Sequence, residues 1–108
     1  MAGCLKLPIR HKYNAVRCEC DGFKFHSKKE RAYYNQLKIR KQAGEVIIFL
    51  MQCPFHFRNG TKYVVDFIEF WSDGSVHFID VKGVRTQSYK NHLKSLSVEY
   101  PEVEIEEK

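Results

Sequence analysis

The sequence predicts an α/β fold of the α+β type, in which helices flank a mixed β-sheet. Two segments with helical spacing and clear start or stop residues alternate with apolar runs rich in β-branched and aromatic residues. The predicted order is hairpin, helix, three strands, helix and strand, which indicates a sandwich of helices on a mixed sheet. The length of 108 residues suits one domain. We expect a basic arm over residues 1–14 and a single domain over residues 15–108.

The first predicted elements are a hairpin and a helix. Residues 16–20 and 23–25 flank Asp21-Gly22, and an Asp-Gly pair between short strands is a strong hairpin signal. Ser27 and Glu30 match a capping box, in which the carboxylate bonds back to the N-cap amide. The helix is therefore predicted from residue 27 to about residue 43, with Gly44 as its stop.

Three strands and a second helix follow. Residues 46–53 form an apolar run that ends at Pro54 and predicts a buried strand. Residues 63–71 and 75–82 are apolar on both faces, as in central strands, and are joined by a short loop. Residues 86–98 are predicted to be helical, with Leu93 and Leu96 facing the core and Lys90 and Lys94 exposed. An edge strand is expected over residues 103–105.

The charge pattern favours a polyanionic partner. Eighteen Lys and Arg residues oppose thirteen Asp and Glu residues, and the C-terminal tail carries Glu102, Glu104, Glu106 and Glu107. Basic groups attract phosphates because binding releases condensed counterions. Surface lysines also keep a protein soluble, so this charge pattern has an explanation without a nucleic-acid partner. We find no signal peptide and no apolar run near the 20 residues of a membrane span, so we expect an intracellular protein without a membrane partner. In such a protein the four cysteines are expected to be free thiols.

An acid and a lysine lie side by side at the end of one predicted strand. Alternate strand residues share a face, so Asp80 and Lys82 project together. A structural salt bridge would explain this pair, but Asp66 adds a second acid in a strand of β-branched and aromatic residues. A three-residue loop ending at Gly74 places Asp66 across from Asp80, whereas a two-residue loop places it on the opposite face. Two such carboxylates repel one another unless a cation lies between them, and a divalent metal prefers oxygen ligands.

Glu30 is a third candidate acid. Its helical spacing with Tyr33, Tyr34 and Leu37 aims the carboxylate inward from the first turn. The capping box gives Glu30 a purely structural alternative role. Three acids and one lysine together favour a metal-dependent site.

The sequence resembles the PD-(D/E)XK nucleases. A helix Glu, a strand Asp and an Asp-x-Lys on the next strand, here Glu30, Asp66, Asp80 and Lys82, match the pattern of that superfamily. More closely, residues 21–30 resemble small phage and prophage proteins filed as a domain of unknown function and sometimes labelled Holliday junction resolvases. Further matching residues are Gln52, Pro54, Gly83, Thr86, Tyr89 and Lys90. The nominal Pro before the strand Asp is Val65 here, at a position that varies widely in the superfamily.

The resemblance implies a restriction-endonuclease-like core and a magnesium-dependent or manganese-dependent endonuclease. Asp66, Asp80 and the Val81 carbonyl would hold the metal, with Glu30 binding directly or through water. Lys82 would position the attacking water or offset charge on the transition state, and Gln52 would support the site. The expected DNA contacts are Lys12, Arg17, Lys28, Lys29, Arg85, Thr86, Lys90 and Lys94.

The resemblance also implies a biological setting. The expected substrate is branched or junction DNA in the cytoplasm of a bacterial host, and the protein is expected to be phage or prophage encoded. Resolvases of this kind usually act as homodimers, because two symmetric cuts need two sites.

Two other classes of function stay open. Cys18, Cys20, Cys53 and His56 could form a zinc site, although structural zinc sites favour Cys-x-x-Cys spacing over Cys-x-Cys. A DNA-binding module with an inactive nuclease fold is the other alternative. The intact set of acids and lysine argues against it.

Overall fold

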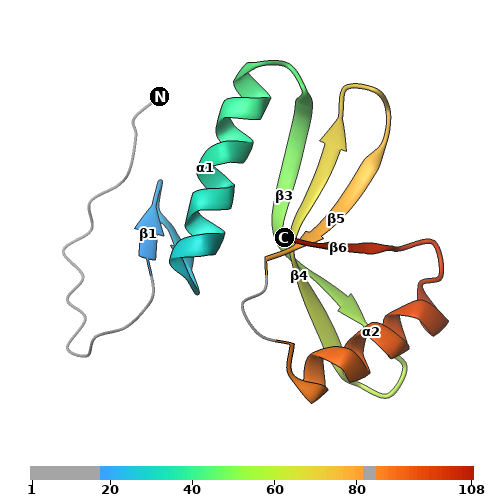
Figure 1. Ribbon diagram of the computed structural model, residues 1–108. Helices are drawn as coiled ribbons and strands as arrows, with labels where there is room; N and C mark the ends of the chain where they lie inside the picture. Colours follow the sequence, from blue (N-terminus) through green and yellow to red (C-terminus); the bar gives the residue numbers. More distant parts are fainter. Residues whose placement is uncertain (1–17, 82–84) are drawn as a thin grey trace, which may run out of the picture. The chain divides into compact units, whose positions relative to one another are not determined.

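The computed structural model describes residues 18–81 and 85–108, with side chains from residue 20 onward. Figure 1 shows its helices and strands. The chain divides into two compact units after Ile39. The predicted basic arm with Lys12, the predicted DNA contact Arg17 and the predicted catalytic Lys82 lie outside the described residues. The single domain expected over residues 15–108 stays a prediction.

The first unit contains the predicted hairpin. Strands β1 (Cys18–Cys20) and β2 (Phe23–Phe25) pair antiparallel. Asp21 and Gly22 both have positive φ, 55° and 83°, which is the conformation of a type I′ turn. The Asp21 carboxylate accepts a hydrogen bond of 2.8 Å from the Tyr34 hydroxyl, so the turn is tied to the helix that follows. The prediction of a hairpin is confirmed.

Helix α1 (Lys28–Gln42) begins and ends where the sequence predicts, to within one residue. At its start, the Ser27 hydroxyl accepts a hydrogen bond of 3.1 Å from the N–H three residues later, as an N-cap does. At its end, Gly44 has φ 83° and the Glu45 N–H donates to the Arg40 carbonyl at 3.0 Å. This pattern is a Schellman motif, in which glycine takes the left-handed conformation without steric cost.

The second unit is built on a four-stranded mixed sheet, which confirms the predicted fold class. The strands lie in the order β3, β4, β5 and β6, with antiparallel pairs except for the parallel pair β5–β6. A parallel pair needs a crossover connection, and helix α2 supplies it between β5 and β6 (Figure 1). The elements are β3 (Val46–His56), β4 (Lys62–Trp71), β5 (Val76–Asp80), α2 (Gln87–Glu99) and β6 (Ile105–Glu107).

Helix α2 packs its apolar side against the sheet. Tyr89 and Leu96 are buried in one core cluster with residues of β4, and Leu93 packs against that cluster. Lys90 and Lys94 are exposed, as the helical spacing predicts. In the part of the chain that the structure describes, no helix is long and apolar enough to cross a membrane.

Strand β3 differs from the prediction of a buried strand ending at Pro54. It lies at the edge of the sheet and continues through Pro54 to His56. Ile47 and Leu50 are 61% and 44% exposed. Proline has no N–H to donate to a neighbouring strand, so it is compatible with an edge strand and incompatible with a central one. The apolar run identified a strand but did not show its place in the sheet.

Strand β6 also differs from the prediction, which placed it over residues 103–105. The Val103 N–H donates to the Tyr100 carbonyl at 3.0 Å in the turn after α2. The parallel pairing with β5 begins only at Ile105, which lies beside Phe78. Because the chain is still in the turn after α2 at Val103, strand β6 begins two residues later than predicted.

Candidate active site

The loop between β4 and β5 determines which residues of the two strands are neighbours. The Trp71 N–H donates to the Ser75 carbonyl at 2.9 Å and the Gly74 N–H donates to the Trp71 carbonyl at 3.0 Å. These bonds enclose a three-residue loop, as the sequence predicts. The resulting register pairs Ile68 with Phe78, and this is the register that brings Asp66 towards the end of β5.

Replacing Gly74 by alanine is expected to lower the free energy of unfolding by about 1 kcal/mol. Gly74 has φ 91°, and a Cβ at this position would meet no atom within 4 Å, so the cost is backbone strain and not a clash. Gly74→Asn is the matched control, because asparagine tolerates the left-handed region better than alanine does. Urea unfolding measures both variants. Equal stability of Gly74→Ala and the wild type would contradict this account of the loop.

Asp66 and Asp80 are buried neighbours on β4 and β5. Their relative exposures are 8% and 0%. The Asp66 N–H donates to Oδ1 of Asp80 at 3.3 Å, and the Val81 N–H donates to Oδ2 of Asp66 at 2.9 Å. Each carboxylate thus accepts a main-chain hydrogen bond from the neighbouring strand or its immediate continuation. The structure brings together three predicted metal-site residues, Asp66, Asp80 and Val81.

Tyr63 is a third polar group at this pair. It is 4% exposed, and its hydroxyl donates to Oδ2 of Asp80. Burial, together with the hydrogen bond to Asp80, holds the pKa of Tyr63 well above its usual value, so the phenol keeps its proton at neutral pH. Sequence reasoning missed Tyr63. No local pattern pointed to it, because the partner of its hydroxyl, Asp80, lies 17 residues later in the chain.

The donor chemistry of the aspartate pair fits a hard cation. Magnesium is usually held by one or two carboxylates and keeps several of its waters, so it does not need a cage of protein ligands. Asp66 and Asp80 supply two carboxylates, and the main chain of Val81 lies at this pair, since its N–H donates to Asp66. Among the described residues, no group of three or more His, Cys, Asp or Glu side chains is placed to hold a metal ion.

Glu30 lies in the first unit, at the start of α1. Its side chain is buried, with a relative exposure of 2% for the residue. Its Oε1 accepts a hydrogen bond of 3.0 Å from the His26 N–H, one residue before the N-cap amide of the predicted capping box. The Glu30 carboxylate therefore helps to satisfy the main chain where the helix begins. Its role beside Asp66 and Asp80 stays a prediction.

Gln52 lies on β3 at the position facing Asp66. Its neighbours along the strand pair with the neighbours of Asp66, Met51 with Phe67 and Cys53 with Val65. Gln52 itself has φ 53°, one of two non-glycine residues with positive φ in the described chain. Such strained backbone is uncommon and tends to occur at functional sites. The register thus places Gln52 and Asp66 at facing positions of two neighbouring strands.

The predicted DNA-contacting residues within the described chain are exposed, and they come from both units. Lys28 and Lys29 begin α1. Thr86 is the N-cap of α2, where its hydroxyl accepts from the Tyr89 N–H at 3.1 Å. The other predicted contacts of the second unit are Arg85, Lys90 and Lys94.

The alternative zinc site stays untested, because the Cys18 side chain lies outside the described residues and Cys20 belongs to the first unit, whereas Cys53 and His56 belong to the second. Cys53 and His56 are three residues apart on β3, so their side chains project from opposite faces of the strand. Cys20 and Cys53 are free thiols, as the sequence predicts. No group with these residues is placed to hold a metal among the residues that the structure describes.

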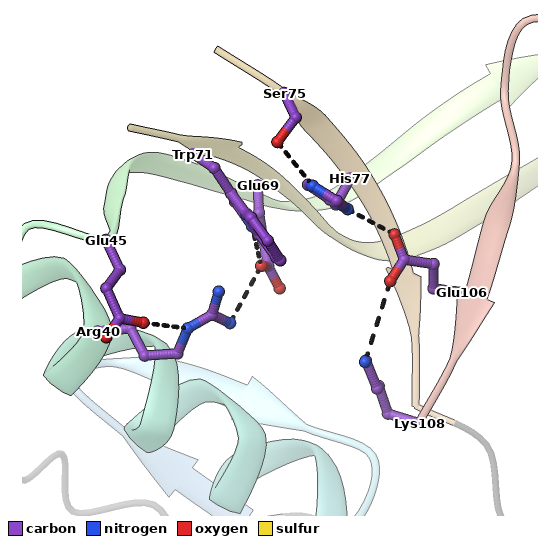
Figure 2. A network of polar contacts seen from close by, with 8 residues as sticks. All are labelled: Arg40, Glu45, Glu69, Trp71, Ser75, His77, Glu106 and Lys108. Carbon is purple, nitrogen blue, oxygen red and sulfur yellow. Dashed lines mark hydrogen bonds and ion pairs between the residues drawn. The ribbon is translucent and has the colours of Figure 1, made fainter. Parts of the chain in front are cut away.

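A second network of charged and aromatic side chains lies in the second unit, together with Asp66 and Asp80 (Figure 2). This network was not predicted from the sequence. Glu69 on β4 is fully buried and accepts hydrogen bonds from Arg40 at 3.3 Å and from the Trp71 indole at 2.8 Å. The Trp71 ring stacks on His77 with 3.6 Å between centroids. His77 in turn contacts Glu106 at 2.6 Å, so this acidic residue belongs to a packed strand and not to a solvated tail. Matched charges and hydrogen bonds indicate a structural role.

One comparison with known proteins found a relationship. A family model described as "Protein of unknown function (DUF1064)" matches residues 10–107. The chain belongs to this family. The comparisons with curated proteins and with solved structures found no match. The family description names no activity, so a function has to be inferred from the geometry of residues such as Asp66 and Asp80.

Proposed function

We propose that this protein is a metal-dependent endodeoxyribonuclease of the PD-(D/E)XK type, which hydrolyses phosphodiester bonds in branched DNA such as Holliday junctions. The observation that supports the proposal best is the contact between Asp66 and Asp80 across β4 and β5. Burying two carboxylates at one place lowers the stability of the fold. Residues that break the rules of stable packing in this way tend to mark functional sites. The pattern of acids and Lys82 in the sequence supports the same reaction.

Each proposed site residue has a distinct task. Asp66, Asp80 and the Val81 carbonyl would hold Mg²⁺ or Mn²⁺, with Glu30 binding directly or through water. The metal would supply Lewis acidity to polarise the scissile phosphate and make water a better nucleophile. Lys82 positions the water or offsets the charge that develops on the phosphate. Gln52, facing Asp66 across the strand pair, supports the site.

The proposed partner is DNA, held by basic residues. Lys90 and Lys94 lie one turn apart on the exposed side of α2 and suit contact with phosphates. The remaining proposed contacts are Lys12, Arg17, Lys28, Lys29, Arg85 and Thr86. A homodimer would provide the two sites needed for paired cuts in a junction, in the cytoplasm of a bacterium that carries the phage or prophage.

A cleavage assay tests the proposal. Wild-type protein and Asp80→Asn are incubated with a labelled four-way junction, a linear duplex, a flap and a single strand, in Mg²⁺, Mn²⁺ or EDTA. We expect wild-type cleavage only with metal, and a loss of at least about 10²-fold in Asp80→Asn, because metal-based charge stabilisation is worth several kcal/mol. Paired symmetric nicks confined to the junction would identify a resolvase.

The same assay can contradict the proposal. If no substrate is cut with either metal while DNA still binds, the protein is a DNA-binding module with an inactive nuclease fold. If Asp80→Asn cuts as fast as the wild type, the reaction does not use the aspartate pair.

A further inference from the structure

The Tyr63 hydroxyl donates a hydrogen bond to one of the two aspartates. Asp80 accepts hydrogen bonds on both oxygens, from the Asp66 N–H on Oδ1 and from the Tyr63 hydroxyl on Oδ2. A carboxylate with a donor on each oxygen has little freedom to rotate about its Cβ–Cγ bond. Because the first donor belongs to the main chain, a substitution cannot remove it, whereas the Tyr63 hydroxyl is a side-chain donor that a substitution can remove.

Core packing determines where the Tyr63 hydroxyl lies. Its ring centroid is 6.1 Å from that of Tyr89 and 6.1 Å from that of His92, both on α2. It belongs to the same buried cluster as Leu96 of that helix. Since buried aromatic rings contacting several neighbours rarely change rotamer, the hydroxyl has one position relative to Asp80. The packing of α2 on β4 thus orients an aspartate at the candidate site.

We propose that Tyr63 is a positioning residue, which holds the Asp80 carboxylate in the orientation that binds a divalent cation. This inference rests on the proposed function, because it takes Asp80 as a metal ligand. Groups that donate hydrogen bonds to a ligating carboxylate fix its direction and commonly contribute roughly 10-fold to 100-fold to metal affinity. Tyr63 itself contacts neither the metal nor DNA in this scheme.

Tyr100 offers a matched control. Its hydroxyl donates to the His56 carbonyl at 2.7 Å, and its ring packs against the same core cluster. Tyr100→Phe and Tyr63→Phe each delete one hydroxyl and keep the ring. Only Tyr63→Phe removes a donor from Asp80. A difference between the two variants in metal binding therefore measures orientation of the carboxylate and not the general effect of losing a buried or half-buried hydroxyl.

The experiment is a calorimetric titration of MnCl₂ into the metal-free full-length protein, as wild type, Tyr63→Phe, Tyr100→Phe and Asp80→Asn. We expect the dissociation constant to rise about 10-fold or more in Tyr63→Phe. It should stay within about twofold of the wild type in Tyr100→Phe, on the order of 0.4 kcal/mol or less. Urea unfolding of both variants verifies that they are folded. A wild-type affinity in folded Tyr63→Phe would overturn the inference.

The Asp80→Asn titration separates this failure from failure of the proposed function. If the wild type binds Mn²⁺ and Asp80→Asn does not, the aspartate site stands and the result for Tyr63→Phe alone decides the role of Tyr63. If the wild type does not bind Mn²⁺, or if Asp80→Asn binds it equally well, the metal site and the role of Tyr63 are both rejected.

Discussion

Replacing Asp66 by asparagine is expected to abolish the stabilisation that Mn²⁺ gives to the wild-type protein. A ligand that binds only the folded state stabilises it by about 2.7 kcal/mol at 100 times its dissociation constant. For a chain of this length, that corresponds to a rise in melting temperature on the order of 10 °C. Asp66→Asn removes one negative charge from the proposed metal site, while the asparagine carbonyl oxygen can still accept the Val81 N–H bond. Thermal unfolding in MnCl₂ and in EDTA measures the difference.

In EDTA, Asp66→Asn is expected to be at least as stable as the wild type. Deleting a charge beside the buried Asp80 relieves repulsion between like charges. Asp73→Asn is the control, because Asp73 lies exposed in the loop between β4 and β5 and hydrogen-bonds to Ser75. This variant should keep the full stabilisation by Mn²⁺. An equal shift in Asp66→Asn and the wild type would mean that the cation binds elsewhere.

Replacing Arg40 by methionine is expected to lower the free energy of unfolding by about 3 kcal/mol. Arg40 donates to Glu69, whose side chain has a relative exposure of 0%, and Arg40 also lies over the Trp71 ring at 5.0 Å. Removing the Arg40 guanidinium leaves the buried Glu69 carboxylate with less positive charge nearby. The resulting loss of stability is far larger than the loss caused by breaking a surface ion pair. Urea unfolding followed by tryptophan fluorescence measures the change, since Trp71 is the single tryptophan of the chain.

Two further variants test the electrostatic explanation. Glu45 is the other acid that Arg40 contacts, at 3.4 Å, and its side chain is 65% exposed. Glu45→Ala should cost less than about 1 kcal/mol, as exposed ion pairs do. The double variant Arg40→Met/Glu69→Gln should regain part of the loss, because the uncompensated charge is gone. A double variant that is less stable than Arg40→Met would show that packing around Arg40, and not the charge of Glu69, carries the effect.

Local patterns in the sequence are sufficient to predict several elements. The Asp21-Gly22 turn, the Ser27 N-cap and the Gly44 stop each depend on backbone preferences of a few adjacent residues, and each prediction is confirmed. The register of β4 and β5 is also predictable, because the loop ending at Gly74 determines it. That register is enough to predict that Asp66 and Asp80 are neighbours.

Contacts between distant segments cannot be predicted in this way. The burial of Glu69 depends on Arg40, which lies 29 residues earlier in the chain. The bond from Tyr63 to Asp80 spans 17 residues, and the Tyr63 ring packs beside Tyr89 of α2. Since such contacts depend on how elements pack, no short pattern in the sequence encodes them.

By itself, then, the sequence determined the elements, the β4–β5 register and the acids that this register brings together. The tertiary structure alone decided that β3 lies at the sheet edge, that β6 begins only at Ile105, and that a buried tyrosine donates a hydrogen bond to Asp80. The physical reason is the range of the interactions. Turns, caps and strand alternation depend on residues that are neighbours in the sequence. The position of a strand in the sheet, the burial of a side chain and the pairing of distant side chains depend on which elements pack against one another to exclude water.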